Sequence, residues 1–210
     1  MYYSSIVNSD TEALQAIINL HIPSKQIDAD ITYSKGNFYK KEISSPKYKY
    51  DLYPQTQDTM KADARSIPLP DSVLTSVVFD PPFLATTGKS LLLKNTSNKI
   101  NKRFSVFPSE KELHLFYREA MKEVHRVLKE GGILIFKCQD KVSSGKNYLS
   151  HVFIIEEAQK IGFYVKDLLI LIAKQRIVAN WQKINQKHVR KYHSYYLVME
   201  KSNKKIKYIE

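Results

Sequence analysis

Four consecutive residues, Asp80-Pro81-Pro82-Phe83, could make an amino group nucleophilic. The lone pair of an exocyclic amino nitrogen on a nucleobase is delocalised into the ring, so the nitrogen attacks only when that lone pair is localised. The Asp80 carboxylate and the Pro81 carbonyl can accept its N–H hydrogens, which favours the localised geometry. The prolines restrict the backbone, so these acceptors need little reorganisation, and Phe83 offers a face for base stacking. The motif therefore predicts a site that presents the amino group of a base as a nucleophile.

The apolar run Leu74–Phe79 comes directly before this motif and predicts a strand buried on both faces, as in a parallel sheet. In open α/β sheets ligands bind beyond the carboxyl ends of the strands, so the motif lies where chemistry is expected. A rigid turn without a catalytic role is the alternative interpretation. A chance Asp-Pro-Pro-aromatic in a chain of this length is on the order of a few in a thousand, which favours the catalytic interpretation.

The elements that would position the motif alternate between strand and helix patterns. Apolar spacing predicts helices over 11–20, 109–129 and 150–161, with Asp10 as N-cap of the first and a Ser-Glu-Lys-Glu capping box opening the second. Strands are predicted over 26–33, 48–52, 74–79, 133–137, 164–173 and 194–199. The sequence therefore predicts an α/β fold with a mostly parallel sheet. Its last two strands, which no obvious helix separates, are expected to form an antiparallel pair at the C-terminal end.

Composition narrows the class of protein. The 210 residues, 43% of them hydrophobic, are expected to form one domain over 1–210. A single cysteine, Cys138, excludes an internal disulfide. No signal-peptide pattern and no membrane-spanning run is visible, so a cytoplasmic location without a membrane partner is expected. The formal net charge of +12 and the pI near 9.5 suit nucleic acid as a partner, although a merely soluble, lysine-rich surface is the alternative.

Over about residues 26–199 the chain resembles the amino-methylating DNA methyltransferases that carry Asp-Pro-Pro-aromatic, which are class I S-adenosylmethionine-dependent enzymes with a Rossmann-like fold. The matching segments are Lys61-Ala-Asp-Ala-Arg-Ser-Ile-Pro-Leu-Pro-Asp with Val77-Val-Phe-Asp-Pro-Pro-Phe, then His125-Arg-Val-Leu-Lys-Glu-Gly-Gly-Ile-Leu, and Gln186-Lys-His-Val-Arg-Lys-Tyr-His-Ser-Tyr-Tyr-Leu-Val. The last is similar to the end of small phage-type and bacterial DNA methylases. The resemblance implies S-adenosyl-L-methionine as cofactor, and Asp80, Pro81, Pro82 and Phe83 as catalytic residues.

The cofactor loop departs from the pattern of these enzymes, Asp-Pro-x-x-Gly-x-Gly. The best match is Asp30-Ile-Thr-Tyr-Ser-Lys-Gly, in which Ser34 replaces the first glycine. Ser34 is tolerated if its φ is ordinary; alternatively the loop has decayed and affinity is weak. By resemblance, Asp51 holds the ribose hydroxyls and Asp63 meets the adenine end of the cofactor, although Asp30 and Asp51 could also be ordinary carboxylates. The implied cofactor-binding residues are Asp30, Thr32, Ser34, Gly36, Asp51, Asp63, Ala64 and Asp80.

Two basic segments, 84–108 and 174–193, are expected to contact the substrate as insertions in the domain. The second interleaves basic and aromatic residues, which suits phosphate contacts and base stacking. The alternatives are a solvated loop for the first and, for the second, a solvated hairpin with Trp181 in the core. The candidate nucleic-acid-binding residues are Lys89, Lys102, Arg103, Lys174, Arg176, Trp181, Lys187, Arg190 and Lys191. His188 and His193 have no ligand-spaced partners, so no metal site is predicted.

The leading hypothesis is methylation of adenine N6 in DNA. Methylation of RNA, at guanine N2 or adenine N6, is the second, since some rRNA guanine-N2 methyltransferases also carry Asp-Pro-Pro-Phe. A third is a catalytically silent nucleic-acid-binding subunit of a methyltransferase complex, because the glycine loop is altered. Little chain is left for a separate target-recognition module, so either relaxed sequence specificity or a protein partner is expected, and a homodimer also stays open.

Overall fold

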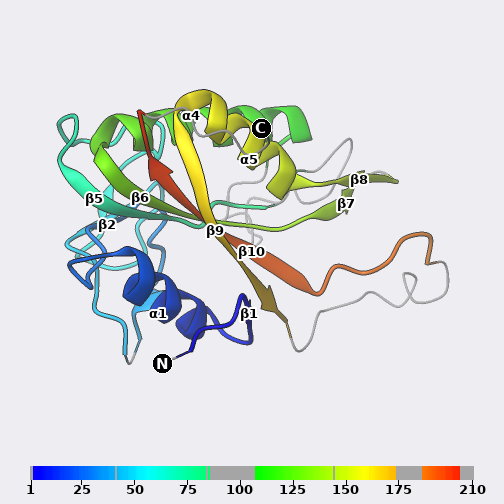
Figure 1. The fold of residues 1–210 in the computed structure, drawn as a ribbon. Helices are drawn as coiled ribbons and strands as arrows, with labels where there is room; N and C mark the ends of the chain where they lie inside the picture. Colours follow the sequence, from blue (N-terminus) through cyan, green and yellow to red (C-terminus); the bar gives the residue numbers. More distant parts are fainter. Residues whose placement is uncertain are drawn as a thin grey trace.

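The computed structural model describes residues 2–40, 42–83, 85, 107–143, 145–173 and 186–203. An eight-stranded sheet forms its centre, in the order β1-β9-β10-β6-β5-β2-β3-β4 (Figure 1). These strands are β1 (Ile6–Val7), β2 (Ala29–Asp30), β3 (Tyr48–Asp51), β4 (Met60–Lys61), β5 (Leu74–Phe79), β6 (Leu128–Cys138), β9 (Phe163–Ile172) and β10 (His193–Lys201). β10 is antiparallel to both of its neighbours, and the other neighbouring strands pair in parallel.

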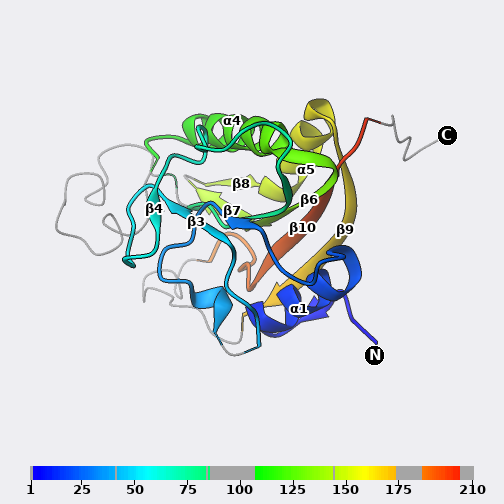
Figure 2. The same ribbon diagram turned by 90° about the vertical axis from the view of Figure 1, so that its left-hand side faces the viewer.

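The remaining elements are helices and one small hairpin. They are α1 (Asp10–His21), the 3₁₀ helix η1 (Asn37–Tyr39), α4 (Glu110–Val127), α5 (Ser150–Ile161), and the strand pair β7 (Lys141–Ser143) and β8 (Lys146–Tyr148). Helices α4 and α5 cover one face of the sheet and α1 covers the other (Figures 1 and 2). None of the helices in the described part of the chain is long and apolar enough to cross a membrane.

The central strands are buried on both faces because their successive side chains enter different cores. Val77 and Phe79 of β5 belong to the cluster that packs against α4 and α5, whereas Val78 belongs to the cluster under α1. Leu134 and Ile135 of β6 divide in the same way. A continuous apolar run is therefore the expected sequence of such a strand, and the predicted α/β class with its C-terminal antiparallel pair is confirmed.

Helix α4 begins as its capping pattern predicts, since the Ser109 hydroxyl accepts a hydrogen bond from the Glu112 N–H at 3.1 Å. It ends two residues earlier than predicted, and β6 follows at once from Leu128, which pairs with Leu74. Helix α1 is capped by Ser9, whose hydroxyl accepts from the Glu12 N–H at 3.1 Å. The prediction of Asp10 as the N-cap was wrong, because Asp10 is already the first helical residue.

The parallel direction of the central strands brings several charged residues to one edge of the sheet. Strands β2 and β3 end at Asp30 and Asp51, Asp80 directly follows β5, and Lys137 lies next to the last residue of β6. Because the strands run in the same direction, their carboxyl ends meet at this edge. Strand β2 has only two residues, far fewer than the predicted 26–33, but it still delivers Asp30 there.

Candidate active site

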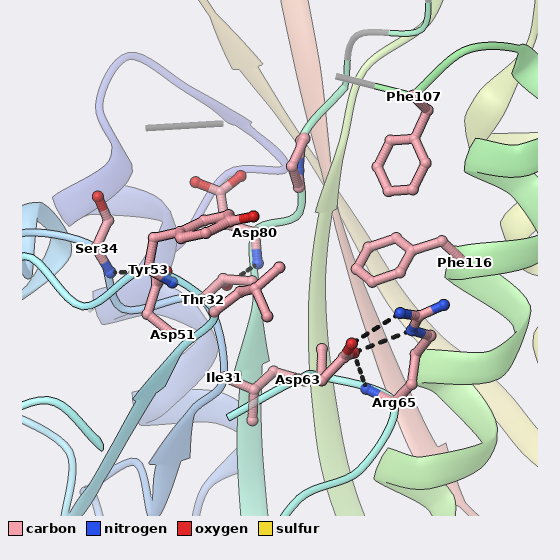
Figure 3. A pocket seen from close by; sticks show the side chains of 13 residues that line it. Ile31, Thr32, Ser34, Asp51, Tyr53, Asp63, Arg65, Asp80, Phe107 and Phe116 are labelled. Carbon is pink, nitrogen blue, oxygen red and sulfur yellow. Dashed lines mark hydrogen bonds and ion pairs between the residues drawn. The ribbon is translucent and has the colours of Figure 1, made fainter. Parts of the chain in front are cut away.

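A cavity of about 210 Å³ opens at the carboxyl edge of the sheet (Figure 3). Its lining contains seven of the residues expected from the sequence, namely Thr32, Ser34, Asp51, Asp63, Ala64, Asp80 and Pro82. Residues that sequence reasoning did not assign complete it: Ile31, Leu52, Tyr53, Arg65, Phe107 and Phe116. Asp30, Gly36, Pro81 and Phe83 do not line it. The structure thus brings most of the candidate cofactor residues together with the start of the Asp-Pro-Pro-Phe motif.

Asp80 combines burial with unused hydrogen-bonding capacity. Its side chain is 26% exposed and lines the cavity, yet Oδ1 is buried and has no hydrogen-bond partner among the described residues. Oδ2 lies 3.7 Å from Nζ of Lys137. Burial raises the pKa of Asp80 to about 6, while the charge of Lys137 acts in the opposite direction. At neutral pH this side chain is therefore mostly a carboxylate, and it can still accept a hydrogen bond.

Three side chains from different parts of the fold hold the backbone of the motif. The Asp80 N–H donates to Oγ1 of Thr32 at 2.7 Å, and the Tyr117 hydroxyl donates to the Pro82 carbonyl at 2.8 Å. Lys141 of β7 donates from Nζ to the Phe83 carbonyl. Pro81 is buried, and among the described residues no hydrogen bond to its carbonyl is found. The backbone of the motif is thus held on both sides of the Pro81 carbonyl, which can still accept a donor.

Asp30 does not line the cavity itself, but hydrogen bonds through Thr32 link it to the residues that do. Its carboxylate is 1% exposed, and Oδ1 accepts from the Thr32 N–H at 2.8 Å and from the Thr32 hydroxyl at 3.3 Å. Oδ2 accepts from the Tyr39 hydroxyl at 2.8 Å. Burial, with a smaller contribution from the charge of Asp80, raises the pKa of Asp30 to about 7. The Thr32 hydroxyl therefore connects Asp30 to the backbone of Asp80.

Ser34 adopts the conformation of the glycine that it replaces. Its φ is +51°, in the left-handed region that disfavours residues with a Cβ, so the condition of an ordinary φ is not met. Its Oγ is buried and has no hydrogen-bond partner among the described residues, and its N–H donates to Oδ2 of Asp51 at 2.8 Å. Gly36 has a φ of +64°, and a Cβ there would collide with the Tyr33 hydroxyl, so Gly36 makes the turn and does not face the cavity.

Asp51 ends β3 at the other side of the same loop. Oδ1 accepts from the Tyr53 N–H at 2.8 Å, and Tyr53 also lines the cavity (Figure 3). Burial raises the pKa of Asp51, while the N–H groups of Tyr53 and Ser34 lower it. Tyr53 had no signal in the sequence beyond its place two residues after the acid at the end of a strand.

Asp63 lies at the far end of the cavity and is paired with Arg65. The guanidinium donates from Nε to Oδ1 at 3.0 Å and from Nη2 to Oδ2 at 2.8 Å, and this pairing lowers the pKa of Asp63. Arg65 also lies over the Phe116 ring at 5.7 Å, and the Phe107 and Phe116 ring centres are 5.0 Å apart. Phe116 lies in the helix predicted over 109–129 from its apolar spacing, and that spacing gave no sign of a place in the site.

Only part of the predicted nucleic-acid surface can be placed. Lys187 is exposed and Arg190 and Lys191 are half-buried in the stretch before β10, outside the cavity lining. The other candidates lie outside the described residues: Lys89, Lys102, Arg103, Lys174, Arg176 and Trp181. Across the described ranges no group of three His, Cys, Asp or Glu side chains could hold a metal ion.

Residues 74–210 match the profile of the N6/N4 methyltransferase family, described as DNA methylase. The match covers more than half of the chain. The chain belongs to this DNA methylase family. The matched segment contains β5, the Asp80–Phe83 motif, α4 and the antiparallel pair that completes the sheet. A comparison with curated protein sequences gave no match.

Two solved structures are similar in fold to this chain. A proposed methyltransferase of Haloferax volcanii, solved in complex with the activator Trm112, is 13% identical with a TM-score of 0.51, covering 93% of this chain and 91% of that one. The [4+2]-cyclase SpnF is 16% identical with a TM-score of 0.50, covering 90% and 81%. Because a cyclase shares the fold, the Rossmann-like class I architecture does not by itself identify the reaction.

One further structure belongs to TTHA0409 of Thermus thermophilus, a proposed DNA modification methylase solved with S-adenosylmethionine. It is 18% identical with a TM-score of 0.46, and the alignment covers 71% of this chain and 57% of that one. The chain therefore spans little more than half the length of TTHA0409.

Proposed function

We propose that this DNA methylase transfers a methyl group from S-adenosylmethionine to the exocyclic amino group of a nucleobase, with adenine N6 in DNA as the preferred target. The observation that carries the proposal is the pair of acceptors at the motif. Asp80 keeps a buried oxygen without a hydrogen-bond partner among the described residues, and the neighbouring Pro81 carbonyl accepts none from them either. An amino group with two N–H donors fits that pair.

The residues of the cavity fit S-adenosylmethionine. Ser34 offers a buried hydroxyl that no described residue uses, which suits a polar group of the cofactor. Asp51 at the end of β3 suits ribose hydroxyls, and Asp63, with the Phe116 ring in the same cavity lining, suits a purine with its amino group. When bound, the cofactor supplies a methyl group on a sulfonium that is already electrophilic, so positioning provides much of the catalysis.

The protein's own part of the reaction is to hold two acceptors and keep them in place. Ionised Asp80 and the Pro81 carbonyl accept the amino hydrogens, which localises the lone pair of the attacking nitrogen. The hydrogen bonds from Thr32, Tyr117 and Lys141 fix the backbone around them, so little reorganisation is required during transfer. As the nitrogen takes the methyl group it gives up one proton, and the Asp80 carboxylate can accept it.

The proposed substrate is a nucleic acid, with DNA favoured by the family and by the net charge of +12. We place the phosphate and base contacts in the segments 84–108 and 174–193 of a single domain. Lys187, Arg190 and Lys191 lie immediately before β10, whose first residues approach the carboxyl edge where β6 ends. The proposal of adenine N6 in DNA is motivated by the Asp80–Phe83 motif, by the resemblance of residues 186–198 to the end of small DNA methylases, and by the basic balance of charge.

The experiment is product identification with a labelled methyl donor. The protein is incubated with methyl-labelled S-adenosylmethionine and double-stranded DNA, single-stranded DNA or RNA, and the products are digested to nucleosides. We expect label in N6-methyldeoxyadenosine. Label in N4-methyldeoxycytidine would overturn the adenine assignment, and label in a ribonucleoside would overturn DNA as the substrate. No detectable binding of S-adenosylmethionine by calorimetry would instead favour a catalytically silent subunit.

A further inference from the structure

Lys137 of β6 places a positive charge beside Asp80, although no role in the reaction has been assigned to it. Its Nζ lies 2.8 Å from Oδ1 of Asp10 and 3.7 Å from Oδ2 of Asp80. The lysine side chain is 13% exposed, whereas Asp10 at the start of α1 is 41% exposed. The ammonium thus lies between a half-exposed carboxylate and the one at the candidate active site.

Aromatic rings restrict where this ammonium can go. Nζ lies 4.9 Å from the ring centre of Phe38 and 5.5 Å from that of Tyr196. The Tyr196 hydroxyl also donates to Asp10, so ring and carboxylate are held together. Such ring faces attract a cation and leave it few alternative positions. Burial disfavours the charged form of Lys137, but the charges of Asp80 and Asp10 outweigh burial and raise its pKa, so Lys137 stays protonated at neutral pH.

We infer that Lys137 is a positioning residue that keeps the Asp80 carboxylate ionised and fixed in orientation for the amino group of the substrate. The inference rests on the proposed function of Asp80 and extends it to a residue 57 positions later in the chain. Without an opposite charge, a buried carboxyl next to other acids would take up a proton and would then donate where it has to accept. The ionisable groups around Asp80 come from five elements: Asp10 of α1, Asp30 of β2, Tyr117 of α4, Lys137 and Cys138 of β6, and Tyr196 of β10.

The direct test measures the ionisation of Asp80 itself. Protein labelled with carbon-13 at the aspartate carboxyls is titrated by NMR, and the Asp80 resonance is assigned from its absence in Asp80→Asn. In Lys137→Met the pH midpoint of the Asp80 titration (the Asp80 midpoint) should rise by about one to three pH units. The reason is that an opposite charge within about 4–6 Å lowers a carboxyl pKa by that amount. Lys137→Arg should keep the wild-type midpoint. Asp10→Asn should lower it, because the charge of Asp10 raises the pKa of Asp80.

Methyl transfer supplies the second readout. If the Asp80 midpoint rises by one to three pH units from a value near 6, the ionised fraction of Asp80 at pH 7 falls by about two- to ninetyfold in Lys137→Met. The kcat at pH 7 should fall by the same factor, and it should recover as the pH increases. Lys166→Met, which removes a lysine paired with Glu200 away from the cavity, is the matched control and should leave the profile unchanged.

An Asp80 midpoint that does not move in Lys137→Met, or a loss of kcat that is equal at every pH, would overturn the inference and leave Lys137 a structural residue. If Lys137→Met does not fold, Asp10→Asn still tests the inference, because it should lower the Asp80 midpoint. An unchanged Asp80 midpoint in Asp10→Asn would contradict the coupling of Asp80 to the neighbouring charges. The NMR titration requires no activity. A wild-type protein that transfers no methyl group would therefore refute the proposed function separately from the role of Lys137.

Discussion

Replacing Thr32 with valine removes the hydroxyl that joins the cofactor loop to the Asp-Pro-Pro-Phe motif. Valine keeps the shape of threonine, so the change is confined to two hydrogen bonds. The Asp80 N–H loses its acceptor at 2.7 Å, and Asp30 loses a weaker donor at 3.3 Å. Asp30 keeps the Thr32 N–H and the Tyr39 hydroxyl, so its carboxylate is not left without partners.

The expected loss of stability follows mainly from the Asp80 N–H. A buried donor without an acceptor costs about 1–3 kcal/mol, and this part-buried group belongs in the lower half of that range, at about 1–2 kcal/mol. For a chain of this size, each kcal/mol lowers Tm by about 2–4 °C, so Thr32→Val should lower it by roughly 2–8 °C. The start of the motif is also less firmly held, so kcat should fall more than the affinity for S-adenosylmethionine.

Thermal unfolding and steady-state methyl transfer check this prediction, with Thr32→Ser as the matched control. Serine keeps the hydroxyl and loses only a methyl group, so its kcat should stay close to that of the wild type. If Thr32→Val and Thr32→Ser have the same Tm and the same kcat, the hydroxyl does not connect the two parts of the site and the reasoning is wrong.

Three more predictions concern the same site. Ser34→Gly should raise the free energy of unfolding by roughly 0.5–1 kcal/mol, since glycine accepts the positive φ without strain; a lower urea midpoint would contradict this. Tyr117→Phe leaves the Pro82 carbonyl without its donor and should cost about 1–2 kcal/mol and reduce kcat, measured by denaturation and methyl transfer. Burial raises the pKa of Asp80 to about 6, so the folded protein holds that proton more tightly than the unfolded chain. The carboxylate form is lost as the pH falls through about 6, and a kcat profile that is flat across that pH would refute its role as acceptor.

The long, strongly patterned elements were predictable because their signals are local. Strand β5 and helix α5 have the predicted bounds, since the largely apolar stretch of β5 and the Gly162 C-cap of α5 leave few alternatives. The placement of Asp80 after a buried parallel strand also followed from the sequence, because parallel strands put their carboxyl ends at one edge. These parts of the fold are specified by residues that are close together in the chain.

What could not be predicted depends on partners far away in the sequence. Strand β1 has two residues and pairs with β9, more than 160 positions later, so its own sequence carries little signal. Lys137 was predicted only as the end of a strand, and the packing of α1 and β10 is what shows that it faces Asp80. The positive φ of Ser34 goes against the preference of serine, and only the completed loop reveals it.

The measurement that tests the central claim most directly compares cofactor binding and methyl transfer in Asp80→Ala. Removing the carboxylate takes away one of the two acceptors, which should lower kcat by about a hundredfold or more, a much larger factor than the change in the calorimetric Kd for S-adenosylmethionine. Asp71→Ala, which removes a carboxylate that is 75% exposed and does not line the cavity, is the matched control and should transfer at the wild-type rate. Wild-type transfer by Asp80→Ala would contradict the claim that the Asp-Pro-Pro-Phe motif presents the amino group.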